Sequence, residues 1–426
     1  MILDYKTSKL KNGIRVISVP MQSTGAVTSL ILVGTGSHYE KKELAGLSHF
    51  LEHLFFKGSK KYPSAKKIST ILDGIGAEYN AFTAEEVTGY YVKTVSDKAE
   101  LALDVMSDYL KNPLFKTEEV NRERGVILEE LRMYYDTPQR HVYDLFKHAL
   151  YGDQPAGRDI GGDEKSVLNI KPKDIKEYFN KQYRGDNIVA VFAGDISHAA
   201  SRRLAEKCLG GLPEGNSYDK EPVKKPDYSK PSVVIQQKPS DQTHLILGFD
   251  GMDLRDDRRY ALDLLSVILG GGMSSRLFSE IRERRGLAYY VRAGAEAGTD
   301  YGCFVSSAGV NNSKVEAAVE VLVREFKKIK TDLVDAAELK KAKNHIEGST
   351  MLDLETSNSV AFYLGGESVL LDRITTPDEY LKNIAKVKAK DVKEAANYIF
   401  QKGSVRFAAI GPYKTPKKIE NMLKKI

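Results

Sequence analysis

The stretch GLSHFLEHLFFKGS, residues 46–59, is the starting point for interpreting this chain. Its apolar residues recur at the spacing of a helix face, so residues 44–56 are predicted to form a helix that ends at Gly58. His49 and His53 are four residues apart, which places both imidazoles on one face of that helix, close enough to share a metal ion. Glu52 lies beside the same face.

Those three side chains are a weak signal when they are taken alone. A pattern with three fixed positions in five recurs by chance, and a histidine on an apolar helix is usually a satisfied core residue. A zinc ion bound by two neutral imidazoles needs a third ligand, an open position for water, and a base that accepts a proton from this water. Glu52 meets the need for a base. The third ligand must come from another segment.

The segment ERGVILEEL, residues 123–131, offers several carboxylates, and helix geometry distinguishes between them. At about 100° per residue, one narrow stripe contains Val120, Glu123, Ile127, Glu130 and Tyr134, whereas Glu129 points about 100° away from Glu130. Carboxylates on a face that is otherwise apolar need a cation or hydrogen-bond partners. We therefore predict that Glu130 is the third zinc ligand and that Glu123 orients a ligand histidine. The alternative is an exposed acidic pair on a surface helix.

Composition is that of an ordinary globular protein long enough for two or three domains, with 426 residues, 42% of them hydrophobic and 29% charged. The net charge of +6 is small and dispersed, so no nucleic-acid partner is expected. Two cysteines, Cys208 and Cys303, cannot form a disulfide framework. The N-terminal residues lack the apolar region of a signal peptide, and no stretch reaches the length of a membrane span, so we expect a cytoplasmic protein without a membrane association.

The order of predicted elements repeats in the second half of the chain. Strands are predicted within 14–34 and at 78–82 and 87–95, and then at 232–249 and 288–310, each set with helices between and after its strands. Ala102, Val105, Met106 and Leu110 match Ala318, Val321, Leu322 and Phe326 at a constant offset of 216 residues. We predict an α+β fold of two homologous domains, each an antiparallel-rich sheet with packed helices: residues 1–220, a linker at 221–231, and residues 232–426.

The second copy carries no second metal site. It has no histidine between His244 and His345, so the counterpart of the first helix lacks the ligands. Its Gly270-Gly271-Gly272 run lacks the lysine and hydroxyl residue of a phosphate-binding loop, which favours a hinge or a close backbone approach over a nucleotide site.

Together, these motifs resemble the inverzincin peptidases, which include pitrilysin, insulin-degrading enzyme and mitochondrial processing peptidase. The resemblance rests on the two segments above, on GAEYNAFT at 76–83, and on SSRLFSEIRERRGLAYYV at 274–291, and it covers essentially the whole chain. It implies a short, two-domain member of bacterial type. On this resemblance we expect a zinc metalloendopeptidase that hydrolyses extended or unfolded peptides, in peptide degradation or in precursor processing.

The resemblance also implies a role for each matching residue. His49, His53 and Glu130 are the zinc ligands, Glu52 is the general base, and Glu123 is the supporting carboxylate. Further residues implied by the resemblance bind the substrate: Asn80 and Ala81 on an edge strand that pairs with the peptide, and Arg282 and Tyr289 at its carbonyl oxygen.

The shorter family members work as pairs of chains, and this chain carries both the metal motif and the Arg282/Tyr289 pair, so a homodimer is implied. The alternative is a non-catalytic scaffold or core subunit of the same fold. A third reading is a maturation peptidase that acts on one dedicated precursor.

Overall fold

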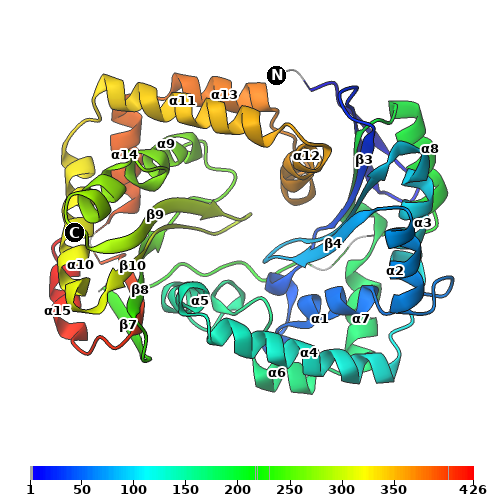
Figure 1. The fold of residues 1–426 in the computed structure, drawn as a ribbon, viewed down its shortest axis with the longest axis horizontal. Coiled ribbons are helices and arrows are strands. Elements are labelled where there is room, and N and C mark those ends of the chain that lie inside the picture. Colours follow the sequence, from blue (N-terminus) through cyan, green and yellow to red (C-terminus); the bar gives the residue numbers. More distant parts are fainter. Residues whose placement is uncertain (1–2, 216, 218, 230, 402) are drawn as a thin grey trace. The chain divides into compact units, whose positions relative to one another are not determined.

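The computed structural model describes residues 3–215, 217, 219–229, 231–401 and 403–426, which form two compact units (Figure 1). Unit 1 comprises Met1–Leu131, Asp159–Glu221 and Thr350–Asp378; unit 2 comprises Arg132–Arg158, Pro222–Ser349 and Glu379–Ile426. Each unit contains one mixed, largely antiparallel sheet with helices packed on it, so the predicted α+β class is confirmed.

Unit 1 is built on a six-stranded sheet in the order β1-β2-β6-β3-β5-β4. The strands are β1 (Lys6–Lys9), β2 (Arg15–Pro20), β3 (Ala26–Val33), β4 (Glu78–Thr83), β5 (Thr88–Val95) and β6 (Ile188–Gly194). Only β2 and β6 pair in parallel among these described strands. Strand β4 forms one edge of the sheet.

Both faces of this sheet are covered, which explains why its central strands are almost continuously apolar. In β6, Phe192 belongs to the core cluster that includes side chains of α1 and α3, whereas Val191 belongs to the cluster around α12. The helices of unit 1 are α1 (Leu47–Phe55), α2 (Ala65–Gly74), α3 (Ala99–Lys111), α4 (Thr117–Tyr135, which ends in unit 2), α6 (Glu164–Asn169), α7 (Pro172–Gln182), α8 (His198–Leu209) and α12 (Ser357–Leu371).

Unit 2 has a five-stranded sheet in the order β7-β11-β8-β10-β9. Its strands are β7 (Ser232–Gln237), β8 (Gln242–Asp250), β9 (Ala288–Ala297), β10 (Gly302–Asn311) and β11 (Arg406–Gly411). Its helices are α5 (Pro138–Tyr151), α9 (Arg259–Gly270), α10 (Val315–Thr331), α11 (Ala336–Asp353), α13 (Pro377–Lys386), α14 (Ala389–Ile399) and α15 (Pro416–Leu423), of which α11 and α13 each have a few residues in unit 1.

The predicted duplication is visible in the sheets. Without β1, the first sheet reads β2-β6-β3-β5-β4, and the second reads β7-β11-β8-β10-β9, so each strand has a counterpart in the same order. The parallel pair β2 and β6 corresponds to the parallel pair β7 and β11. Helices α3 and α10, which follow the corresponding strands β5 and β10, bury the residues that match at the offset of 216.

One feature of the units differs from the domain boundaries expected from the sequence. Helix α5 belongs to the first half of the chain but packs on β8 and β11 of unit 2, and α12 belongs to the second half but packs on β3 and β6 of unit 1. The two halves have therefore exchanged one helix each, and residues 1–220 are not one continuous unit. The expected linker at 221–231 begins at Glu221, which is the last residue of that segment of unit 1, and its other described residues belong to unit 2; residue 230 lies outside the described residues.

Local structure follows the predicted signals closely, with one shift. The helix expected at 44–56 is Leu47–Phe55, because Lys42–Leu44 form a separate 3-10 turn and Gly46 interrupts the helical path. Cys208 and Cys303 are buried free thiols.

Candidate metal centre

Helix α1 is preceded by its N-cap residue Gly46, whose φ of 91° lies in the left-handed region that glycine adopts without strain. A β-carbon at Gly46 would lie 2.3 Å from the carbonyl oxygen of Gly161, so two backbone segments touch here. The backbone N–H groups of Gly46 and Ser48 donate to the carboxylate of Glu40 at 2.7 and 2.6 Å. Burial raises the pKa of Glu40 to about 7, although these bonds oppose the rise. The first turn of α1 is thereby fixed.

The apolar face of α1 determines where its polar side chains lie. Phe50, Leu51, Leu54 and Phe55 are at most 3% exposed and pack into the core of unit 1. His49, Glu52 and His53 are half-buried on the remaining face, and the two imidazole rings are 4.7 Å apart between centroids in an edge-to-face arrangement.

Helix α4 brings its acidic stripe to the histidines. Val120, Glu123 and Ile127 are buried, Glu130 is half-buried, and Glu129 is exposed, as the helical stripe predicts. Oε2 of Glu130 lies 3.6 Å from Nε2 of His49 and 3.3 Å from Nε2 of His53. The ligand atoms of the three residues all lie within 4.8 Å of one another.

This triangle fits a zinc ion. Ligand atoms at about 2.0–2.1 Å from a tetrahedral zinc are roughly 3.3 Å apart, close to the two distances from Glu130. The His49, His53 and Glu130 side chains are 12, 20 and 21% exposed, so solvent reaches all three and water could take a fourth position on a bound ion. Two imidazoles and one carboxylate, with an open position, are the ligand set of a catalytic zinc site.

Glu123 contacts His53, one of the candidate ligands. Its Oε2 atom is 3.3 Å from Nδ1 of His53, and its Oε1 atom is 2.8 Å from Nζ of Lys57. Burial raises the pKa of Glu123, but His53 and Lys57 outweigh burial and lower it below its usual value. Burial lowers the pKa of His53, but hydrogen bonds to Glu123 and Glu130 outweigh this and raise it to about 9. A zinc ion bound by His53 would compete with that proton, because a ligand imidazole is neutral.

Glu52 is held by a residue from strand β4. The hydroxyl group of Thr83 donates a hydrogen bond of 2.6 Å to Oε2 of Glu52. Burial raises the pKa of Glu52 above its ordinary value, while the Thr83 hydrogen bond lowers it. A carboxylate with a raised pKa accepts and returns a proton near neutral pH more readily than an ordinary one.

Asn80 and Ala81 lie in the middle of the same edge strand. Asn80 is exposed, Ala81 is buried, and both residues pair with β5 on one side only. An edge strand presents backbone N–H and C=O groups on its outer side, where an extended chain can add as a further strand.

Arg282 and Tyr289 belong to unit 2. Arg282 lies in the π-helical turn Phe278–Glu283, and Tyr289 lies near the start of β9 and is 72% exposed. The guanidinium carbon of Arg282 is 5.4 Å from the centroid of the Tyr289 ring and 4.9 Å from that of Phe278. The two predicted substrate-binding side chains are therefore neighbours.

Three supporting residues were not singled out from the sequence: Glu40, Lys57 and Thr83. Lys57 follows His53 by four residues, so the periodicity that picked out the histidines also extends to it. Thr83 ends the GAEYNAFT string, but its contact with Glu52 joins residues 31 positions apart, and no local pattern encodes it.

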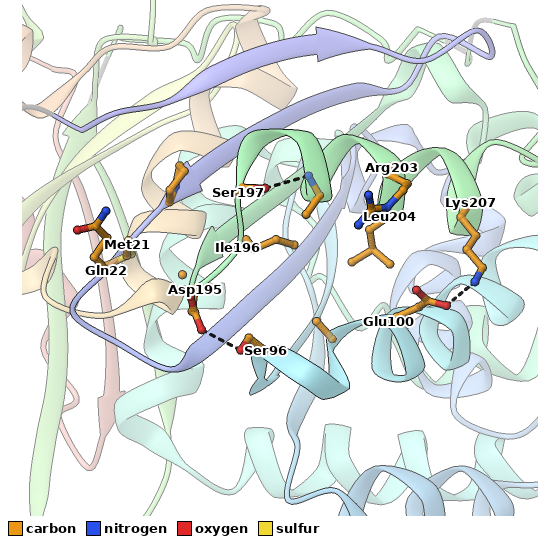
Figure 2. A pocket seen from close by; sticks show the side chains of 14 residues that line it. Met21, Gln22, Ser96, Glu100, Asp195, Ile196, Ser197, Arg203, Leu204 and Lys207 are labelled. Atoms are coloured by element: carbon orange, nitrogen blue, oxygen red, sulfur yellow. Dashed lines mark hydrogen bonds and ion pairs between the residues drawn. The ribbon is translucent and has the colours of Figure 1, made fainter.

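A separate cleft of about 570 Å³ lies in unit 1, where β2 and β6 end and α3 and α8 begin (Figure 2). Met21, Ile196 and Leu204 give it apolar walls. Its charged rim includes an ion pair between Lys207 and Glu100. None of the predicted site residues lines this cleft.

Comparison with known proteins identifies the class of protein. Residues 15–164 match the family description "Insulinase (Peptidase family M16)", and residues 169–346 match "Peptidase M16 inactive domain". His49, His53 and Glu130, and also Glu52 and Glu123, lie in the first match. The chain is 34% identical to the uncharacterized zinc protease YmxG of Bacillus subtilis over 92% of this chain and 94% of that protein. The chain therefore belongs to the M16 family of peptidases.

Solved structures agree with this assignment. A protease from Helicobacter pylori superimposes with a TM-score of 0.90 at 26% identity, covering 96% of this chain and all of that one. A chain of complex III2 from Candida albicans has a TM-score of 0.85 at 16% identity, covering 98 and 99%, which shows a shared fold. None of the helices in the described part of the chain has the length and apolar character that a membrane span requires.

Proposed function

We propose that the protein is a zinc-dependent endopeptidase that hydrolyses extended or unfolded peptides. The observation that carries this proposal is that the ligand atoms of His49, His53 and Glu130 lie within 4.8 Å of one another. The half-buried Glu52 lies on α1 with the two histidines. Family membership and relatives named as zinc proteases support it.

His49, His53 and Glu130 would hold the zinc ion. When bound, zinc supplies Lewis-acid chemistry that lowers the pKa of water and polarises a peptide carbonyl group. Glu52 takes the proton of the attacking water and gives it to the leaving amine. Thr83 donates to Oε2 of Glu52, and we assign the proton transfer to the other oxygen, Oε1. Glu123 contacts Nδ1 of His53 and so would direct Nε2 towards a bound metal ion.

The edge strand β4 supports the proposed substrate class. A peptide added beside Asn80 and Ala81 forms backbone hydrogen bonds, which require an extended chain but no particular side chain. Folded proteins lack such free segments, so short or unfolded peptides are the preferred substrates.

Arg282 and Tyr289 are proposed to donate hydrogen bonds to the substrate carbonyl oxygen, where negative charge develops in the transition state. This role rests on the family resemblance and on the neighbouring positions of the two donors. A homodimer is proposed on the same resemblance, and sedimentation velocity at several protein concentrations tests it.

The decisive experiment compares zinc content and cleavage of a quenched, unstructured peptide library for wild type and Glu52→Gln. We expect one zinc per chain in both proteins, cleavage by wild type alone, and loss of cleavage when a chelator is added. Zinc-loaded wild type that cleaves no peptide would instead support a non-catalytic scaffold. Activity confined to one precursor would support a dedicated maturation peptidase.

A further inference from the structure

Lys57 lies two residues after the end of α1 and continues the row of polar side chains that begins with His49 and His53. It lies four residues after His53, and its backbone N–H donates to the carbonyl oxygen of Leu54, so the chain still follows a helical turn there. The basic side chains of this segment alternate in space with the acidic side chains of α4. Their order is Lys57, Glu123, His53, Glu130 and His49, with successive contacts of 2.8, 3.3, 3.3 and 3.6 Å.

Glu123 depends on both of its neighbours in this row. Its side chain is only 3% exposed, and its two oxygens are divided between His53 and Lys57. An ionised carboxylate that is buried without a cation costs several kcal/mol. A neutral imidazole contributes a hydrogen bond but no charge, so with zinc on His53 the only cation in contact with Glu123 among the described residues is Lys57.

The charges of the complete site also favour a cation at position 57. When ionised, Glu52, Glu123 and Glu130 bring three negative charges, of which one divalent zinc ion would neutralise two. The ammonium group of Lys57 neutralises the third. The Lys57 side chain is 29% exposed, so its stem is largely covered while the charge stays near Glu123.

We propose that Lys57 is a positioning residue of the metal centre, which holds Glu123 against Nδ1 of His53 and so keeps Nε2 directed at the metal. This proposal rests on the zinc site of the proposed function but not on peptidase activity. Residues that orient a ligand histidine typically change metal affinity by about 10–100-fold when they are removed.

The test measures the zinc dissociation constant by competition with a chromogenic chelator. The variants are Lys57→Met, which keeps the stem and removes the charge, and Lys57→Arg, which keeps the charge. Lys61→Met is the matched control, because Lys61 also forms an ion pair, with Asp104, but has no contact with the site. Thermal unfolding of each zinc-free variant checks that it folds.

We expect Lys57→Met to weaken zinc binding about 10–100-fold, and Lys57→Arg and Lys61→Met to stay within about twofold of wild type. A double-mutant cycle with Glu123→Gln shows whether Lys57 acts through Glu123: in that background, Lys57→Met should have little further effect. Wild-type affinity in Lys57→Met, or additive losses in the double variant, overturns the proposal. Wild type that binds no zinc overturns the proposed function as well.

Discussion

The hydrogen bond between Thr83 and Glu52 gives the sharpest prediction about catalysis. Thr83→Val preserves the shape and strand preference of the side chain and removes the 2.6 Å donor to Glu52. A hydrogen bond to a charged group contributes about 1.5–3 kcal/mol. When this whole free energy serves to orient Glu52 in the transition state, the kcat of Thr83→Val falls by about 10–100-fold, because 1.36 kcal/mol corresponds to a factor of ten in rate.

Steady-state cleavage of a quenched peptide separates this effect from others. We expect a lower kcat, a KM within about twofold of wild type, and unchanged zinc content, because the Thr83 hydroxyl group bonds to the proposed base Glu52 and to none of the proposed ligands. Thr83→Ser keeps the hydroxyl group and should retain most of the activity. Thr88→Val is the matched control: Thr88 faces Thr83 across the strand pair but donates to the carbonyl oxygen of Thr35. An unchanged kcat in Thr83→Val would refute the reasoning.

Two further predictions concern the start of α1. The pKa of Glu40 is about 7 in the folded chain against 4.5 as its ordinary value, so the folded state binds the proton more tightly. The stabilisation from this proton is complete below about pH 4.5 and is lost as pH rises to about 7, amounting to about 3 kcal/mol at most. Denaturant unfolding of the zinc-free protein should show this slope in wild type and not in Glu40→Gln; identical slopes would contradict it. Gly162→Ala should destabilise the chain by about 2 kcal/mol or more, because Gly162 has a φ of 73° and a β-carbon there would lie 2.2 Å from the carbonyl oxygen of Ala45. A Gly162→Ala variant with the thermal stability of wild type would contradict this prediction, because the backbone around residue 162 would then have adjusted without cost.

Much of the fold could be predicted from the sequence because its signals are local. Strand alternation, helix periodicity and capping residues such as Ser64, which accepts from the backbone N–H of Lys67, depend on neighbours within a few positions. The duplication was also visible, since the two copies bury corresponding residues of α3 and α10. The exchange of α5 and α12 was not visible, because an apolar helix surface does not specify which of two similar sheets it covers.

The sequence by itself determined the spacing of His49, Glu52 and His53 and the stripe that separates Glu130 from Glu129, because helix geometry alone fixes those directions. Only the tertiary structure decided that α4 lies against α1, that Lys57 meets Glu123, and that Thr83 reaches Glu52. These contacts join residues 31 to 81 positions apart. They depend on how buried helices and strands pack, which no local pattern of residues encodes.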